Sequence, residues 1–121
     1  MRKTVDVAVP QGLPFSAAVW AGDLLYVSGQ VGLDPQTSRL VEGVAAQTAT
    51  ILRNVEAVLR AAGKSLDDVV KCNIYLSSMS HYAAMNEAYA AAFGKPFPAR
   101  TCVAVAALPL SADVEIEVIA R

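Results

Sequence analysis

Residues 44–76, VAAQTATILRNVEAVLRAAGKSLDDVVKCNIYL, decide the fold class because their apolar periodicity changes halfway along the stretch. Over residues 44–62 the apolar positions recur three or four residues apart, which predicts an amphipathic helix. Gly63 follows this pattern as a glycine follows a helix C-terminus. Residues 69–76 are rich in β-branched and aromatic side chains and predict a strand. A helix that leads into a strand indicates a mixed fold.

Strand patterns both precede and follow residues 44–76, and one further helix pattern follows them. The predicted strands are residues 4–9, 15–20, 24–30, 69–76, 100–106 and 114–120, and the predicted helices are residues 44–62 and 81–93. The order β-β-β-α-β-α-β-β predicts an α+β fold with a single sheet and two helices on one face. The short connection between the last two strands predicts that they pair as a hairpin.

The face of this sheet that the helices leave uncovered is predicted to be apolar. Strand residues alternate between faces, so one face of LLYVSG carries Leu24 and Tyr26 and the other carries Leu25 and Val27. The chain is 55% hydrophobic, and its mean hydropathy is +0.40. We therefore expect the uncovered face to be buried against other copies of the chain.

Length and charge limit the classes of function. The 121 residues fit one domain, residues 1–121. The net charge is −1 and the Lys and Arg residues are scattered, so no nucleic-acid partner is expected. The first ten residues carry no apolar signal core, and no apolar run reaches the ~18 residues of a spanning helix. We expect a cytoplasmic protein with no membrane partner.

Neither a metal nor an organic cofactor is predicted. Cys72 and Cys102 lie far apart and His81 is the single histidine, so no spacing suits a metal site. In a reducing compartment both cysteines are expected to be free thiols. The glycine-containing stretch SGQVG, residues 28–32, lacks the lysine of a phosphate loop and is typical of a strand exit.

Arg100 is the candidate for chemistry, because it opens an otherwise apolar strand in FPARTCVAVAALP, residues 97–109. A guanidinium group pairs well with carboxylates, so Arg100 is predicted to bind an anionic ligand, and a glutamate further in would orient water. The alternative is a structural ion pair with Glu115 or Glu117. The two partners lie at unequal distances from the hairpin turn, so a pair across the hairpin is not favoured, and an oligomer would be needed to join them.

Five segments in order resemble the RidA (YjgF) family across nearly the whole chain. They are LLYVSGQVGLDPQT, VLRAAG, DDVVKCNIYLSSM, YAAMNEAYAAAF and FPARTCVAVAALPLSADVEIEVIA. The resemblance implies a chorismate-mutase-like fold and a homotrimer with ligand clefts between subunits. It also implies a cofactor-independent 2-iminobutanoate/2-iminopropanoate deaminase, which hydrolyses reactive enamines and imines, such as 2-aminoacrylate, to 2-oxo acids and ammonia.

The same resemblance implies roles for individual residues. Arg100 matches the arginine that grips the substrate carboxylate, and Cys102 matches a cysteine whose backbone N–H holds the same group. Glu115 matches the glutamate that orients the attacking water. Ser28 and Gly29 match a pocket segment.

Two further positions complete the implied site. Asn86 matches a pocket asparagine, although by its place in a helix alone it would be a solvent-facing residue. Phe15 stands where relatives carry a tyrosine in a GPY segment, so the ring is kept and its hydroxyl is absent. This departure affects the implied rate and substrate choice.

Two other functions compete with the deaminase. A non-catalytic trimer could bind small 2-oxo acids or amino acids as a sensor. A ribonuclease or translation inhibitor is the third interpretation, and the pI of about 5.7 and the absence of a basic stripe in the sequence count against it.

Overall fold

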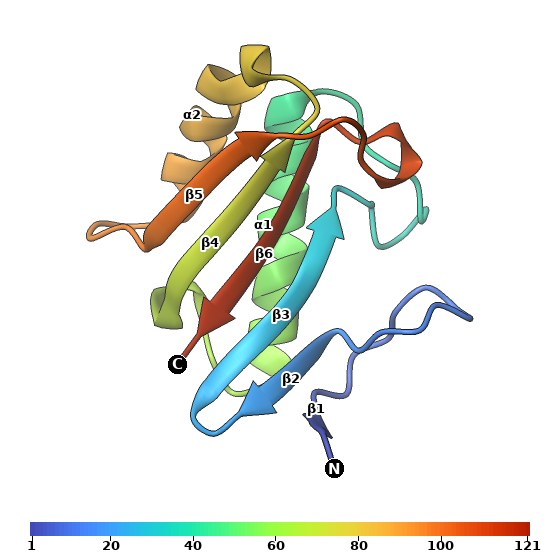
Figure 1. The fold of residues 1–121 in the computed structure, drawn as a ribbon, viewed down its shortest axis with the longest axis vertical. Coiled ribbons are helices and arrows are strands. Elements are labelled where there is room, and N and C mark those ends of the chain that lie inside the picture. The colour runs from blue at the N-terminus through green and yellow to red at the C-terminus, as the bar shows by residue number, and fades with distance from the viewer.

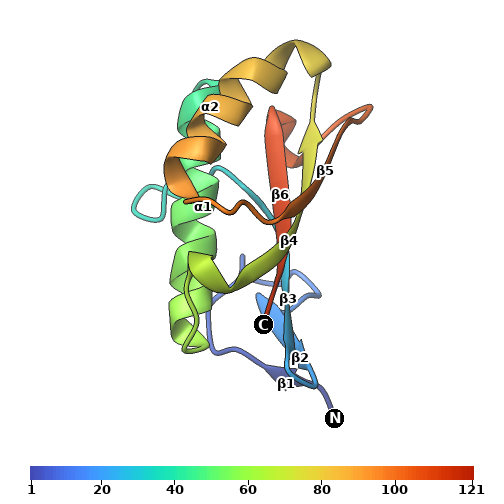
Figure 2. The same cartoon turned by 90° about the vertical axis from the view of Figure 1, so that its left-hand side faces the viewer.

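Both α-helices lie against the same side of one six-stranded sheet, as Figures 1 and 2 show. The computed structural model describes all residues 1–121. The elements in chain order are β1 Lys3–Thr4, β2 Ala18–Ala21, β3 Leu24–Val31, α1 Val44–Ala61, β4 Val69–Leu76, α2 Tyr82–Ala92, β5 Ala99–Ala104 and β6 Val114–Ala120. The predicted element order and the α+β class are confirmed.

The predicted hairpin between the last two strands is wrong. The strand order is β1-β2-β3-β6-β4-β5, so β6 lies between β3 and β4, and β5 is an edge strand parallel to β4. Every second side chain of β6 is buried, from Val114 to Ala120, whereas β5 has no fully buried residue. Burial of the β6 apolar face under the helices therefore favours the central position for β6 over pairing with its neighbour in sequence.

The N-terminal strands are shorter than their sequence patterns predict. Of the predicted strand 4–9 only Thr4 lies in β1 (Lys3–Thr4), which pairs with β2, and β2 begins at Ala18 rather than at residue 15. Val7 and Val9 leave the ladder but still pack against the core. The alternating pattern of this segment thus reflects burial of its valines rather than strand pairing.

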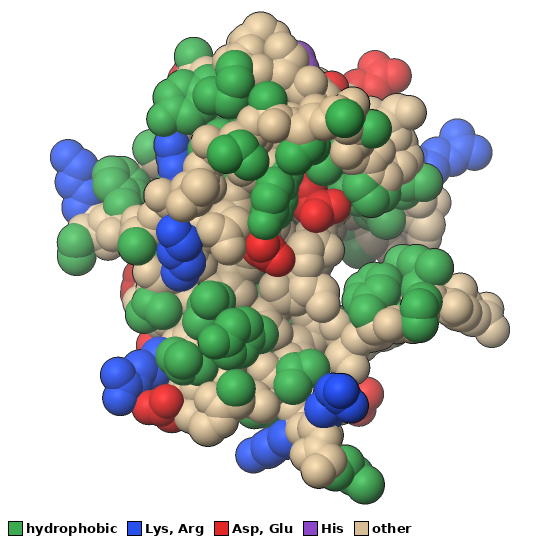
Figure 3. Space-filling model, in the orientation of Figure 1, with side chains coloured by type: hydrophobic (Ala, Val, Ile, Leu, Met, Phe, Trp, Pro, Cys, Tyr) green, Lys and Arg blue, Asp and Glu red, His purple; other side chains and the backbone are tan.

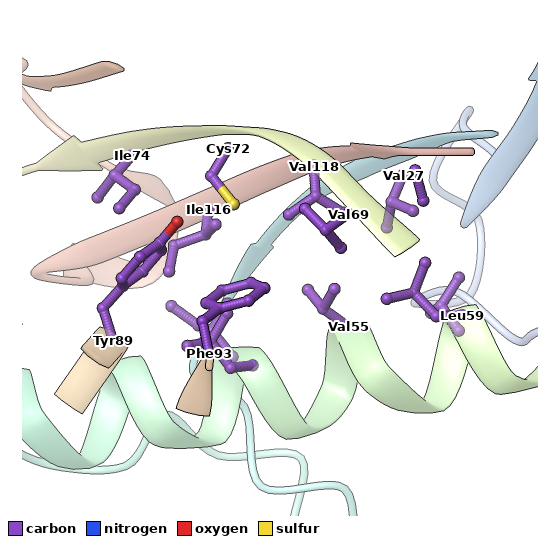
Figure 4. Close-up of a cluster of buried hydrophobic side chains, with 14 of the residues drawn as sticks. Val27, Val55, Leu59, Val69, Cys72, Ile74, Tyr89, Phe93, Ile116 and Val118 are labelled. Carbon is purple, nitrogen blue, oxygen red and sulfur yellow. The ribbon is translucent and has the colours of Figure 1, made fainter. Parts of the chain in front are cut away.

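The core fills the space between the sheet and the helices. In Figure 4, Val55 and Leu59 of α1 and Phe93, just after α2, face Cys72 and Val118 from the strands. Helix α1 approaches the sheet closely at Gly32, where an added Cβ would lie 2.8 Å from Cα of Gln47. Gln47 is almost fully buried, and its Oε1 accepts a hydrogen bond from the Asp113 backbone N–H at 2.9 Å. This contact fixes the start of α1 against the start of β6.

No element of the chain covers the other face of the sheet, called here the open face (Figure 2). Apolar side chains gather on it on either side of a small acidic group, as Figure 3 shows. Tyr26 and Val103 are among its exposed apolar residues, and Glu115 and Glu117 of β6 point to it. No helix combines the length and hydropathy that a membrane-spanning segment needs.

Candidate functional site

Arg100 lies on the helix-facing side of the edge strand β5, where α2 holds its guanidinium group. Its Nη1 donates a hydrogen bond to Oδ1 of Asn86 (2.7 Å), and its Nη2 donates one to the Tyr82 hydroxyl (3.1 Å). Its Cζ is 5.6 Å from the Tyr82 ring centroid and 5.1 Å from that of Tyr89. Both distances are within the range of cation–π attraction, so α2 fixes the position of this charge from several directions.

The three α2 residues that contact Arg100 share one helix face because of their spacing. Tyr82, Asn86 and Tyr89 follow one another at four and three residues, which places them in line along α2. Asn86 is therefore not simply solvent-facing. Sequence reasoning missed Tyr82 and Tyr89, although their spacing around Asn86 was a visible signal.

Arg100 makes no ion pair within its own chain, so the alternative of a structural pair with Glu115 or Glu117 finds no support there, and a pair between copies stays a prediction. The ion pairs that form are Arg60–Glu56 and Arg121–Asp23. A guanidinium group has five N–H donors, and those of Arg100 satisfy two acceptors, both neutral. Its positive charge is held in place without an anion, which suits a carboxylate or phosphate ligand.

Cys102 lies two residues beyond Arg100 on the same side of β5 and packs against the core. Burial raises the pKa of its thiol, and the nearby charge of Arg100 acts in the opposite direction. A thiol with a raised pKa stays protonated at neutral pH and is a poor nucleophile. We therefore do not assign a nucleophilic role to the Cys102 sulfur. We name Arg100, Asn86 and Cys102 the arginine group.

Glu115 lies on the open face of β6, directly over Gly29 of β3. A Cβ at Gly29 would lie 2.8 Å from Oε2 of Glu115, so a residue without a side chain leaves space for the carboxylate. The β3–β6 register shifts between Val27 and Gln30, next to this contact. Burial raises the pKa of Glu115, and the charge of Glu117 raises it further. Such a carboxylate is a stronger base than a solvent-exposed one.

Glu117 is fixed beside Glu115 by two neighbours on β4. The Tyr75 hydroxyl donates a hydrogen bond to Oε1 of Glu117 at 2.5 Å, and Nδ2 of Asn73 donates one at 3.3 Å. The hydrogen bond to Glu117 is the main reason why the pKa of Tyr75 is raised. The Glu117 charge is thus held where it acts on Glu115.

Ser28 ties the segment that follows Phe15 to β3. The Ser28 hydroxyl donates a hydrogen bond to the Ser16 carbonyl at 2.6 Å, and its backbone N–H donates one to the Ala17 carbonyl at 2.9 Å. The Phe15 side chain remains 44% exposed at the end of this segment. Ser28 therefore positions the loop that carries Phe15. We name Phe15, Ser28, Gly29 and Glu115 the glutamate group.

A single chain does not bring the arginine group and the glutamate group together. Arg100 pairs in register with the core-facing Cys72, whereas Glu115 pairs with Tyr75 on the open face, so their side chains leave opposite faces of the sheet. Two hollows of about 330 and 340 Å³ lie elsewhere, between α1 and α2 and beside residues 93–98, and neither is lined by Arg100 or Glu115.

The remaining titratable residues form no metal-binding cluster. No group of three or more His, Cys, Asp or Glu residues is arranged to hold a metal ion. His81, just before α2, lies 3.5 Å from Oδ1 of Asp113 through its Nε2, and the Ser77 hydroxyl donates to the same oxygen at 2.9 Å. These contacts join the end of β4 to the start of β6 and give His81 a structural role.

The chain is similar to known proteins over almost its whole length. The family model described as endoribonuclease L-PSP matches residues 7–121. A RutC family protein of Pyrococcus horikoshii is 46% identical over 108 residues, which cover 88% of this chain and 86% of the relative. A RutC family protein of Drosophila melanogaster is 45% identical over 118 residues, which cover 97% and 85%. The crystal structure of RidA from an Antarctic Psychrobacter is 44% identical, has a TM-score of 0.92 and covers 98% of each chain.

Proposed function

Because this chain belongs to the RidA/RutC family, which also bears the name endoribonuclease L-PSP, we propose that it hydrolyses reactive imines of 2-oxo acids. The substrate class is 2-iminopropanoate or 2-iminobutanoate and the corresponding enamines, such as 2-aminoacrylate. The observation that carries the proposal is Arg100, whose charge α2 holds in place without an anionic partner. The substrate carboxylate supplies that anion.

The proposed reaction needs only positioning and one base. The carboxylate of the imine binds Arg100, and Glu115 accepts a proton from a water molecule as its oxygen attacks the iminium carbon. Glu115 returns this proton to the nitrogen of the resulting carbinolamine. The C–N bond then breaks as the hydroxyl group gives its proton back to Glu115, and ammonia and the 2-oxo acid are released. The raised pKa of Glu115 favours its role as the base. No metal or organic cofactor takes part in this scheme.

The proposal includes a homotrimer with clefts between its subunits. Arg100 and Glu115 leave opposite faces of one chain, so one active site needs the arginine group of one copy and the glutamate group of a neighbour. The uncovered, partly apolar open face supports association of copies. The proposed location is the cytoplasm, where unpaired thiols such as Cys72 and Cys102 persist.

Trapping of free imine tests the activity directly. An amino-acid oxidase generates the imine from alanine or 2-aminobutyrate, and semicarbazide captures what remains. The protein should reduce the amount of semicarbazone in proportion to its concentration. Pyruvate binding without any loss of semicarbazone would instead indicate a non-catalytic binding protein.

An endoribonuclease, the activity in the name of the family model, is the competing function. The net charge of −1 and the carboxylates of Glu115 and Glu117 on the open face do not favour a polyanionic substrate. Cleavage of a single-stranded RNA that Arg100→Ala abolishes, together with unchanged imine lifetimes, would favour the ribonuclease.

A further inference from the structure

Tyr82 places a hydroxyl group beside the charge that binds the substrate in the proposed reaction. It lies at the start of α2, with its oxygen 3.1 Å from Nη2 of Arg100 and its ring 5.6 Å from Cζ. The residue is 40% exposed, so its hydroxyl is not sealed in the core. A ligand that reaches Arg100 therefore also reaches the Tyr82 oxygen.

Because Arg100 donates the hydrogen bond to Tyr82, the Tyr82 hydroxyl keeps its own hydrogen for another acceptor. A tyrosine hydroxyl has one O–H donor as well as its acceptor lone pairs. The Tyr82 oxygen accepts from Arg100, and its own hydrogen is donated to no other group of the chain. That hydrogen is available to an anion, and an anion bound at Arg100 would be the nearest strong acceptor.

The second tyrosine at Arg100 cannot act in the same way. The Tyr89 hydroxyl is buried without a hydrogen-bond partner, and Figure 4 shows it directed toward the sheet. Burial is the main reason why the pKa of Tyr89 is raised. Tyr89 offers Arg100 only the face of its ring, whereas Tyr82 offers both a ring and a hydroxyl.

We propose that the Tyr82 hydroxyl is a further carboxylate-binding group, which donates a hydrogen bond to the substrate oxygen that Arg100 holds. This inference rests on the proposed function, because it takes the same 2-oxo acid or imine as ligand. It adds a binding contact from α2 to the one from β5. The substrate carboxylate is thus held between two elements rather than by one side chain.

Tyr82→Phe tests this contact because it keeps the ring over Arg100 and removes only the hydroxyl. A hydrogen bond to a charged group contributes enough that its loss should raise the Kd for pyruvate about ten-fold. KM for imine hydrolysis should rise with it while kcat changes little, because the contact exists before and during the reaction. Tyr82→Phe and the parent should have the same Tm, so that the change in Kd reports the lost contact rather than a loss of folding.

A second background separates direct binding from a mere orienting effect on Arg100. In Arg100→Lys, the added change Tyr82→Phe should still weaken pyruvate binding, measured by calorimetry. If the added change has no effect there, the hydroxyl acts only through the guanidinium and the inference is wrong. A Kd for Tyr82→Phe within two-fold of the parent value, at unchanged Tm, would also overturn it.

The proposed function and this inference fail in different ways. If the parent binds pyruvate and hydrolyses imines but Tyr82→Phe behaves identically, only the role of Tyr82 is lost. If the parent neither binds pyruvate nor shortens imine lifetimes, both are lost together.

Discussion

Arg100 is a cation that the protein orients but does not neutralise. Asn86 and Tyr82 satisfy the guanidinium with neutral oxygens, and two aromatic rings lie within cation–π distance of it. An arrangement of this kind leaves the charge available to a ligand. The ion-pair interpretation survives only between copies of the chain, where Arg100 would support assembly rather than bind substrate.

Substitution of Arg100 distinguishes these roles. Lysine keeps the charge but loses the bidentate geometry and the contacts to Asn86 and Tyr82, and each charge-assisted hydrogen bond contributes roughly 1.5–3 kcal/mol. Arg100→Lys should therefore lose about ten- to a hundred-fold in kcat/KM, and Arg100→Ala more. Pyruvate affinity should fall in parallel while the Tm changes little. A well-folded Arg100→Ala with undiminished pyruvate binding would exclude the carboxylate clamp, and a lower Tm as the main effect would favour the ion pair.

The charge of Glu117 should set the pH range in which Glu115 works. Burial and then Glu117 raise the pKa of Glu115, and the base must be ionised, so kcat falls as the pH drops through this raised pKa. Glu117→Gln removes the like charge and keeps an oxygen for the Tyr75 hydroxyl. The pKa of Glu115 should then be lower, and the acidic fall in kcat should move to lower pH. A pH profile identical to that of the parent would show that Glu117 does not act on the catalytic base.

Among the helices and strands, the local sequence pattern predicts each element better than it predicts which strands pair in the sheet. The helical periodicity of residues 44–62 and the strand pattern of 69–76 both appear in the structure, because each depends on which side chains one element buries. The pairing of β6 depends instead on residues far away in sequence. The connection at residues 105–113 bends through a 3-10 turn at Pro109–Ser111, in which Leu110 and Ser111 have φ of 59° and 56°, and this carries the chain past β4. Nothing in the apolar pattern of β5 or β6 shows that β6 lies beside β3 and β4 rather than beside β5.

Two glycines of β3 and its exit test how the elements approach one another. A Cβ at Gly32 would meet the α1 backbone at Gln47, which cannot move aside, so Gly32→Ala should cost about 1–3 kcal/mol of unfolding free energy. A Cβ at Gly29 would meet only the end of the Glu115 side chain. Gly29→Ala should therefore keep most of the stability and lose kcat, because the carboxylate is displaced.

Denaturant unfolding and imine hydrolysis on the two glycine variants provide the comparison. Equal losses of unfolding free energy in Gly32→Ala and Gly29→Ala would show that the backbone contact at Gly32 is no less tolerant of a Cβ than the side-chain contact at Gly29. Full kcat in Gly29→Ala would mean that the position of the Glu115 carboxylate over Gly29 has no part in the reaction.

At the scale of the whole molecule, the open face and the divided site have a common explanation. The alternation in LLYVSG predicts an apolar face without cover, and the structure leaves Tyr26 exposed there. The residues of the site were identified by resemblance. Arg100 and Glu115 are already expected from the sequence to lie apart in one chain, but this expectation rests on a hairpin that does not form. Their placement on opposite faces follows instead from the central position of β6. That position directs Glu115 to the open face while Arg100 faces α2.

The most direct measurement mixes two inactive variants, Arg100→Ala and Glu115→Gln, by co-refolding in equal amounts. In a cyclic trimer whose sites combine Arg100 of one copy with Glu115 of the next, every mixed trimer contains one intact site, so about a quarter of all sites regain function. The mixture should recover about a quarter of the parental imine hydrolysis, while each variant refolded alone remains inactive. A mixture as inactive as its components, with mixed trimers shown to be present, would contradict a site shared between copies and place Arg100 and Glu115 in a site of one chain.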